Sequence, residues 1–346
     1  MTPARLSLLF PCVLAACGGG DSTGPAPGNT NTPGTVSHTV TIGGQARQFV
    51  VHVGDSVGRH EAVPVVFMFH GSSQNGPQFY NISGWREQAD TNGFIAVFPS
   101  ALTYCYHEDG NNDGDFLDAG ETTVGSKWTH GELNTTAMPL CTPTEVAALT
   151  PGEQAAVNHA FQEDVPFVDS MLAVLRRDYL VDSTRIYGSG FSNGSAFAAR
   201  LVADRNQVFA ALSGHPGGLN VPTAPGRAIS FSASLGAMDP HWTVPLAIAT
   251  LPVGPTLFTD YPGVKAKYVT PMLAQLELAD APVYDEFFLS GKKVARWTYS
   301  TSLVGASNTF VFSLLEDNDH SYPNGVGHPI VLARPLWAFF QTQVLP

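Results

Sequence analysis

The segment 185–204, RIYGSGFSNGSAFAARLVAD, decides how the chain folds. Residues 185–187 read as a short strand, and Phe197 and Leu201 are spaced as on one face of a helix. Between them, residues 190–194 match G-x-S-x-G, a pattern that places a serine on a sharp turn between a strand and a helix. Glycine is needed there because a side chain at either flank would collide with neighbouring backbone. The segment therefore predicts a nucleophilic Ser192 exposed above a sheet.

Two continuously apolar runs, 65–69 and 94–98, precede this segment. Such runs are typical of strands buried on both faces, in a parallel sheet covered by helices. Strand-like and helix-like stretches alternate to the C-terminus, with helices expected over 82–92, 154–178, 192–204 and 329–341. Residues 36–42 and 48–53 predict an antiparallel hairpin. The pattern predicts one doubly wound, mostly parallel α/β domain over residues 36–346.

A serine nucleophile needs a histidine base and a carboxylate that orients this base, in the chain order Ser, acid, His for this motif. Asp239 follows the strand-like residues 228–233, and His320 follows those at 309–315. We therefore predict a catalytic triad of Ser192, Asp239 and His320. The alternatives for the acid are Asp260, Asp280 and Asp285, which lie in segments expected to be helical or exposed. The alternatives for the base are His215, His241 and His328, which we expect to line the pocket or to cap a helix.

An oxyanion hole needs two backbone N–H donors that point at the developing negative oxygen. The residue after the nucleophile, Asn193, is expected to supply one. The loop after the first buried strand begins His70-Gly71-Ser72, and we predict the N–H of Ser72 as the second donor. His70 is expected to hold this turn in place rather than to act as a base.

Four motifs together resemble the extracellular polyhydroxybutyrate depolymerase and feruloyl esterase group of α/β-hydrolases. They are HGSSQ at 70–74, GFSNG at 190–194, GAMDP at 236–240, and HSYP at 320–323 with LWAFF at 336–340. The resemblance spans residues 45–342 and implies an α/β-hydrolase fold, serine ester hydrolysis, and triad positions for Ser192, Asp239 and His320. The chain departs from the group at Ser72, where a cysteine is common, and at 317–319, where glycines usually precede the histidine.

The N-terminus has the layout of an export signal. Residues 1–17 carry Arg5, an apolar run and Leu14-Ala15-Ala16-Cys17, which resembles the bacterial lipobox. We expect Cys17 to be lipidated and residues 18–35, rich in Gly, Pro and Thr, to form a flexible linker. The catalytic domain would then lie outside the cytoplasm, secreted or anchored by lipid to the cell surface or outer membrane. Cleavage elsewhere, with Cys17 incidental, is the alternative.

Residues 101–150 break the alternation of strand and helix, which predicts a functional insertion or lid. In an oxidising compartment, Cys105 and Cys141 are expected to form a disulfide that closes this insertion, with two buried thiols as the alternative. An acidic run inside it places oxygen ligands as calcium loops do, at Asp109, Asn111, Asp113, Asp115 and Glu121. Glu121 falls one residue late for an EF-hand, so a solvated acidic turn is the alternative to a structural calcium site.

Four aromatic residues are expected in loops on the catalytic side of the sheet: Tyr104, Tyr106, Trp128 and Trp242. Their rings would hold a flat or hydrophobic acyl group, although core packing is the alternative for each ring. With 17 basic and 29 acidic residues, the net charge of −12 argues against a nucleic-acid partner.

These observations predict an exported serine carboxylic ester hydrolase that works through an acyl-enzyme and needs no cofactor for catalysis. The expected substrates are polymeric or small esters: polyesters, including synthetic ones, and aromatic or hydroxyacid esters. A non-catalytic surface lipoprotein that binds a polymer or sugar is one alternative, and an acetylxylan esterase is another.

Overall fold

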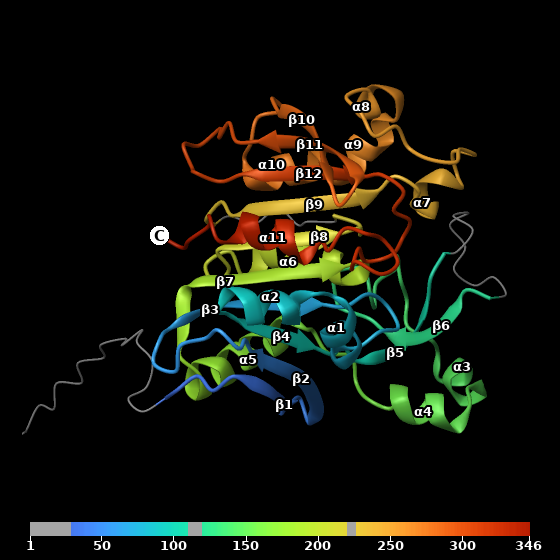
Figure 1. Ribbon diagram of the computed structural model, residues 1–346. Helices are drawn as coiled ribbons and strands as arrows, with labels where there is room; N and C mark the ends of the chain where they lie inside the picture. The colour runs from blue at the N-terminus through green and yellow to red at the C-terminus, as the bar shows by residue number, and fades with distance from the viewer. Residues whose placement is uncertain (1–28, 110–119, 220–225) are drawn as a thin grey trace, which may run out of the picture.

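The computed structural model describes residues 29–109, 120–219 and 226–346. Within these residues, the centre of the main sheet consists of β4 (Ile95–Pro99), β3 (Val63–Phe69), β7 (Val181–Phe191), β8 (Ala211–His215), β9 (Ser230–Gly236) and β12 (Phe310–Leu315), all parallel. One edge is the antiparallel hairpin of β1 (Gly34–Ile42) and β2 (Gln45–Val53). The other edge is β11 (Lys292–Tyr299) and β10 (Val283–Leu289), also antiparallel. The strand order is β1-β2-β4-β3-β7-β8-β9-β12-β11-β10 (Figure 1).

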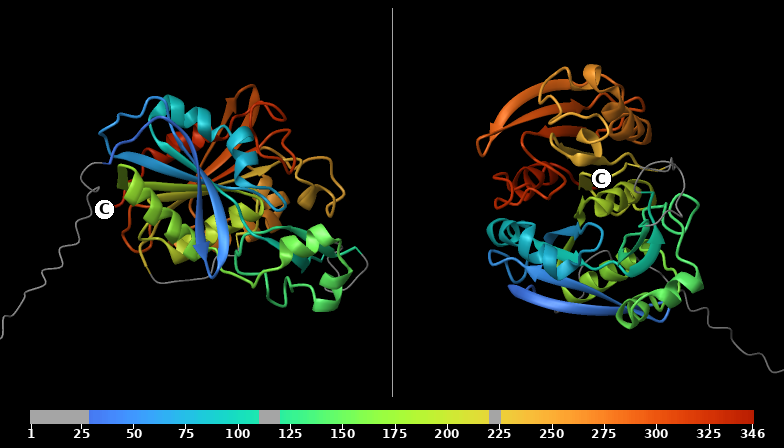
Figure 2. Two further views of the ribbon diagram at one scale, coloured as in Figure 1. Left: turned by 90° about the horizontal axis from the view of Figure 1, so that it is seen from below. Right: turned by 90° about the vertical axis from the view of Figure 1, so that its right-hand side faces the viewer.

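Helices cover both faces of the sheet, as Figure 2 shows. Both faces need this cover because the strands are apolar on both sides. In β3, for example, successive buried side chains point alternately into two apolar cores. Val65, Phe67 and Phe69 face the core shared with α5 (Val165–Asp178) and α6 (Asn193–Asp204). Val66 and Met68 face the core shared with α1 (Gly76–Ile82), α2 (Trp85–Asn92) and α11 (Ala333–Phe340).

The predicted doubly wound sheet and its hairpin are confirmed, but three predicted helices have the wrong boundaries. The helix expected over 329–341 begins only at Ala333. The helix expected over 154–178 is split into α4 (Pro151–Val157) and α5, since Pro166 suits the first turn of a new helix. The helix expected over 82–92 begins only after Gly84, whose φ of 77° lies outside the helical region. Strand β10 and the short helices α7 (Pro240–Thr243), α8 (Leu257–Asp260), α9 (Pro262–Tyr268) and α10 (Thr270–Leu276) were not predicted.

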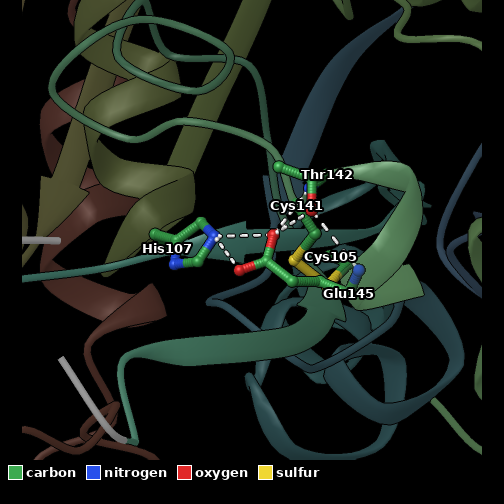
Figure 3. The surroundings of a disulfide bond; sticks show 5 residues. All are labelled: Cys105, His107, Cys141, Thr142 and Glu145. Carbon is green, nitrogen blue, oxygen red and sulfur yellow. Dashed lines mark hydrogen bonds and ion pairs between the residues drawn. A yellow bond between two sulfur atoms is a disulfide. The ribbon is translucent and has the colours of Figure 1, made fainter. Parts of the chain in front are cut away.

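The insertion leaves the main sheet after β4 and returns at α5. It forms a separate two-stranded sheet of β5 (Thr103–His107) and β6 (Thr122–Ser126), followed by α3 (Pro143–Ala148) and α4. The predicted disulfide is confirmed: Cys105 on β5 is bonded to Cys141, just before α3 (Figure 3). The insertion lies at the end of the sheet towards which the arrows of the parallel strands point (Figure 1).

The expected linker ends earlier than residue 35. Asn31 is fully buried, and its side chain exchanges hydrogen bonds with the backbone of Leu180, while Gly34 already begins β1. The predicted signal peptide, Cys17, and residues 110–119 with Asn111, Asp113 and Asp115 lie outside the described residues. Among the described helices, none has the length and apolar character needed to span a membrane.

Candidate active site

The turn between β7 and α6 has the geometry that the G-x-S-x-G pattern predicts. Ser192 lies between them with φ 50° and ψ −118°, a strained conformation for a residue with a side chain. A Cβ atom on Gly190 would lie 2.0 Å from the carbonyl oxygen of Gly194, and one on Gly194 would lie 2.3 Å from that of Phe69. Both positions therefore require glycine, and the hydroxyl of Ser192 is held at the C-terminal end of the sheet.

The structure brings Ser192, Asp239 and His320 together from three strand ends. Asp239 follows β9 and caps α7, and His320 follows β12. The hydroxyl of Ser192 is 2.9 Å from Nε2 of His320, and Nδ1 of His320 is 2.9 Å from Oδ2 of Asp239. With the ring proton on Nδ1, the imidazole donates to the carboxylate and offers a lone pair to the serine hydroxyl. This arrangement suits transfer of the serine proton to His320.

Asp239 is 1% exposed and accepts hydrogen bonds on both carboxylate oxygens. Besides His320, its donors are the backbone N–H and the Nδ1–H of His241, at 3.0 and 2.9 Å. Burial alone would raise the pKa of Asp239, but the hydrogen bonds from His241 and His320 outweigh burial and lower this pKa below its usual range. The carboxylate is therefore ionised, as its orienting role requires.

A buried histidine, His215, supports the loop that carries His320. His215, at the end of β8, is fully buried, and its Nε2 lies 2.9 Å from Oδ1 of Asn318 while Nδ1 lies 2.8 Å from the hydroxyl of Ser234. Burial, helped by the nearby His320, lowers the pKa of His215 to about 3. A neutral His215 thus fixes Asn318, two residues before His320.

The loop with the predicted second oxyanion donor is held by His70, as expected. His70 is fully buried, its Nδ1 is 2.7 Å from the carbonyl oxygen of Gly71, and its Nε2 accepts the N–H of Ala101 at 3.0 Å. Burial lowers the pKa of His70 to about 4, so the ring stays neutral and can hold both bonds. Ser72 and Asn193 both line the cleft at Ser192.

Trp128, which we expected to contact substrate, is instead a buried link between the insertion and both oxyanion segments. Its ring is 0% exposed and its Nε1–H donates to the carbonyl oxygen of His70 at 2.9 Å. Its backbone exchanges two hydrogen bonds with the side chain of Asn193, at 2.6 and 3.2 Å. The ring also stacks on Phe197 of α6. Sequence spacing gave no signal for this role, because residues 128 and 193 meet only through the tertiary fold.

The other predicted aromatic contacts need the same correction. Tyr104 and Tyr106 are buried on β5 in a small core of the insertion with Leu133 and Met138, since this two-stranded sheet needs its own apolar packing. Trp242 packs beside the main core and donates to the hydroxyl of Tyr268 at 3.2 Å. None of these three rings is among the residues that line the cleft at Ser192.

The cleft itself is more polar than expected. It has a volume of about 170 Å³ and is lined by Ser192 and His320. The insertion contributes Glu108, Lys127, His130 and Glu132, while Lys267 and Tyr268 come from α9. Nζ of Lys127 lies 2.6 Å from the carboxylate of Glu108. The walls therefore offer charged and hydrogen-bonding groups rather than an aromatic slot.

Two groups of described residues have the donor atoms for a metal ion. The first, His107, Cys141 and Glu145, has its sulfur in the disulfide, which removes the thiolate ligand (Figure 3). The second is Asp239, His241 and His320. Of the predicted calcium ligands, only Asp109 and Glu121 are described, and both make other interactions.

No protein-family model and no curated protein matches the chain. Similar solved structures include an acetyl xylan esterase from Aspergillus awamori, with 12% identity and a TM-score of 0.49, over 88% of this chain and 99% of that one. An S-formylglutathione hydrolase from Agrobacterium tumefaciens has 15% identity and a TM-score of 0.49, over 90% and 98%. A ferulic acid esterase from Anaeromyces mucronatus has 12% identity and a TM-score of 0.43, over 94% and 95%.

The fold is assigned on the geometry of the chain itself. A mostly parallel sheet places a serine on a strained turn after β7, an acid after β9 and a histidine after β12, which is the Ser, acid, His order of this motif. The chain therefore has the α/β-hydrolase fold, with an antiparallel hairpin at its N-terminal edge and a disulfide-closed insertion beside the nucleophile.

Proposed function

We propose that the protein is a serine carboxylic ester hydrolase. The observation that carries this proposal is the pair of 2.9 Å hydrogen bonds that connects Ser192, His320 and Asp239 at the cleft. The hydroxyl oxygen of Ser192 attacks the ester carbonyl carbon while its proton passes to Nε2 of His320. Asp239 holds the ring and stabilises the imidazolium that forms.

The negative oxygen of the tetrahedral intermediate then faces the backbone N–H groups of Ser72 and Asn193. Protonated His320 gives its proton to the departing alcohol, which leaves an acyl group on Ser192. A water molecule, deprotonated by the same histidine, attacks this acyl-enzyme and releases the carboxylic acid.

The polar cleft favours esters with hydroxyl groups near the cleaved bond, such as acylated sugars and short hydroxyacid oligomers. An aromatic or synthetic polyester would displace water from the partly exposed carboxylates of Glu108 and Glu132 without replacing the lost hydrogen bonds, which is unfavourable. Sugar hydroxyls can replace those bonds. This observation favours acetylxylan-type esters, our second candidate, over the aromatic esters suggested by the sequence.

Hydrolysis assays test both the proposed esterase activity and the proposed substrate class. The purified domain should cleave a p-nitrophenyl ester and the Ser192→Ala variant should not; equal rates would instead support a non-catalytic polymer- or sugar-binding protein. A panel of acetylated xylan, hydroxybutyrate oligomers, methyl ferulate and terephthalate esters then ranks the substrates. We expect the first two to give the highest kcat/KM.

We also propose that the domain is exported and anchored through lipidated Cys17. The disulfide between Cys105 and Cys141 supports an oxidising compartment. Detergent phase partition should place the full-length protein in the detergent phase and a Cys17→Ser variant in the aqueous phase. Equal partition of the two would contradict the lipid anchor.

A structural calcium ion in the acidic loop remains a proposal, supported by the ligand spacing from Asp109 to Glu121. Calorimetry should detect calcium binding that the Asp113→Ala variant loses. An unchanged titration would favour the solvated acidic turn.

A further inference from the structure

His241 lines the cleft and shares the buried carboxylate of Asp239 with the proposed base. Its Nδ1 lies 2.9 Å from Oδ1 of Asp239, while Nδ1 of His320 lies 2.9 Å from Oδ2. The two imidazole rings are 4.3 Å apart between centroids. The second imidazole helps to keep Asp239 ionised but takes no part in the proton transfer between Ser192 and His320.

The carboxylate of Asp239 has no permanent cationic partner among the described residues. Its ion pairs are with His241 and His320, which carry charge only when protonated. Hydrogen bonds alone therefore compensate a side chain that is 1% exposed. A divalent cation at this position would neutralise the buried charge directly.

The donor set and its spacing fit a first-row divalent ion. The ligand atoms of Asp239, His241 and His320 all lie within 4.8 Å of one another. Tetrahedral zinc with bonds near 2.0–2.1 Å places its ligand atoms roughly 3.3 Å apart, so small side-chain rotations suffice. Two imidazoles and one carboxylate with a fourth position open to water is a common zinc ligand set.

The site is also accessible from the cleft. The side chain of His241 is 60% exposed and that of His320 is 24% exposed. An ion can therefore bind His241 first and then reach the buried carboxylate. Lys267 also lines the cleft and opposes cation entry, whereas Glu132 favours it.

We propose that Asp239, His241 and His320 form an inhibitory binding site for a divalent first-row metal ion, with zinc as its representative. Coordination through Nδ1 of His320 and Nδ1 of His241 requires the single proton of each ring to move, through solvent, from Nδ1 to Nε2. Nε2 of His320 then has no lone pair for the proton of Ser192, so the base is lost while the ion is bound. The inhibition rests on the proposed hydrolase function, but the binding does not.

Calorimetry with zinc chloride tests the binding on untagged protein with its disulfide intact. We expect one zinc ion per chain. The affinity for zinc should fall more than about tenfold in His241→Gln, because loss of a mere hydrogen-bond partner of a metal ligand already lowers metal affinity by about that factor. His60→Gln, which changes an exposed histidine elsewhere, should bind as the wild type does. Thermal melts confirm that the His241→Gln variant is folded.

The proposal is overturned if the wild type binds no zinc, if His241→Gln binds equally well, or if His60→Gln loses binding to the same extent. A second measurement addresses the mechanism. Zinc should inhibit ester hydrolysis over the range in which it binds, and EDTA should restore the rate. Binding without inhibition would refute coordination of His320, whereas absence of all esterase activity would count against the proposed function and leave the calorimetric result to decide the metal site.

Discussion

Replacement of Trp128 by phenylalanine separates a structural role for this residue from a substrate contact. The substitution keeps an aromatic ring against Phe197 but removes the N–H that donates to the carbonyl oxygen of His70 at 2.9 Å. It also leaves space where the larger indole was fully buried.

The magnitude follows from these two losses. An unpaired buried carbonyl group costs about 1–3 kcal/mol. Complete removal of a buried tryptophan side chain costs about 3–5 kcal/mol in stability, and replacement by the smaller phenylalanine ring costs only part of this amount. We expect the free energy of unfolding to fall by about 2–4 kcal/mol.

Activity should fall in a characteristic way, because His70 begins the loop that carries Ser72. A displaced oxyanion donor affects the transition state more than bound substrate, so kcat should fall by up to about 100-fold with KM nearly unchanged. Urea unfolding and steady-state hydrolysis of p-nitrophenyl acetate and methyl ferulate measure both effects. Trp242→Phe is the matched control, since this partly buried ring also donates one hydrogen bond, but to Tyr268 rather than to an oxyanion segment.

The reasoning would be refuted by the opposite pattern. If Trp128→Phe keeps its stability and its kcat, but raises KM selectively for the aromatic ester, then the indole contacts substrate after all. Equal effects of Trp128→Phe and Trp242→Phe would likewise remove the special role of Trp128.

Three further predictions concern stability. Asp164→Ala leaves Arg47, its buried partner at 2.5 Å, without a counter-charge and should cost about 3–5 kcal/mol in urea unfolding; a loss below about 1 kcal/mol would contradict this. Replacing Cys105 and Cys141 together by serine opens a loop with a sequence separation of 36 residues and should cost about 3–4 kcal/mol, which an unchanged melting curve would disprove. Burial lowers the pKa values of His70, His130 and His215 from 6.5 to between about 3 and 4. As the pH falls below 6.5, these histidines therefore bind protons in the unfolded chain before they do so in the folded protein, which favours unfolding. The free energy of unfolding should drop by about 4 kcal/mol from pH 7.5 to 5.5, and a constant value would contradict neutral rings at these three positions.

The sequence predicted those features that depend on local chemistry. Gly190 and Gly194 leave room for neighbouring backbone, and continuous apolar runs belong to strands with two covered faces. Asp239 and His320 were recognisable because each lies in the loop after a strand. These signals are readable in a few consecutive residues.

Features that depend on tertiary packing were not predictable in this way. An aromatic residue in a loop can face a cleft or a core. Tyr104 and Tyr106 face the insertion's own core, whereas Trp128 faces the main core against Phe197 of α6. Strand β10 was missed because it is an exposed edge strand, in which the adjacent acids Asp285 and Glu286 interrupt the apolar residues and leave no period-2 pattern. The two hydrogen bonds between Asn193 and the backbone of Trp128 join segments 65 residues apart, and no local pattern predicts them.

Covalent trapping tests the central claim most directly, namely that Ser192 is activated by His320 at a distance of 2.9 Å. A fluorophosphonate probe should add one phosphonyl group per chain, which peptide mass spectrometry should locate on Ser192, and labelling should slow severely in His320→Gln. An adduct on another residue, or equally fast labelling in His320→Gln, would contradict the proposed nucleophile and its base.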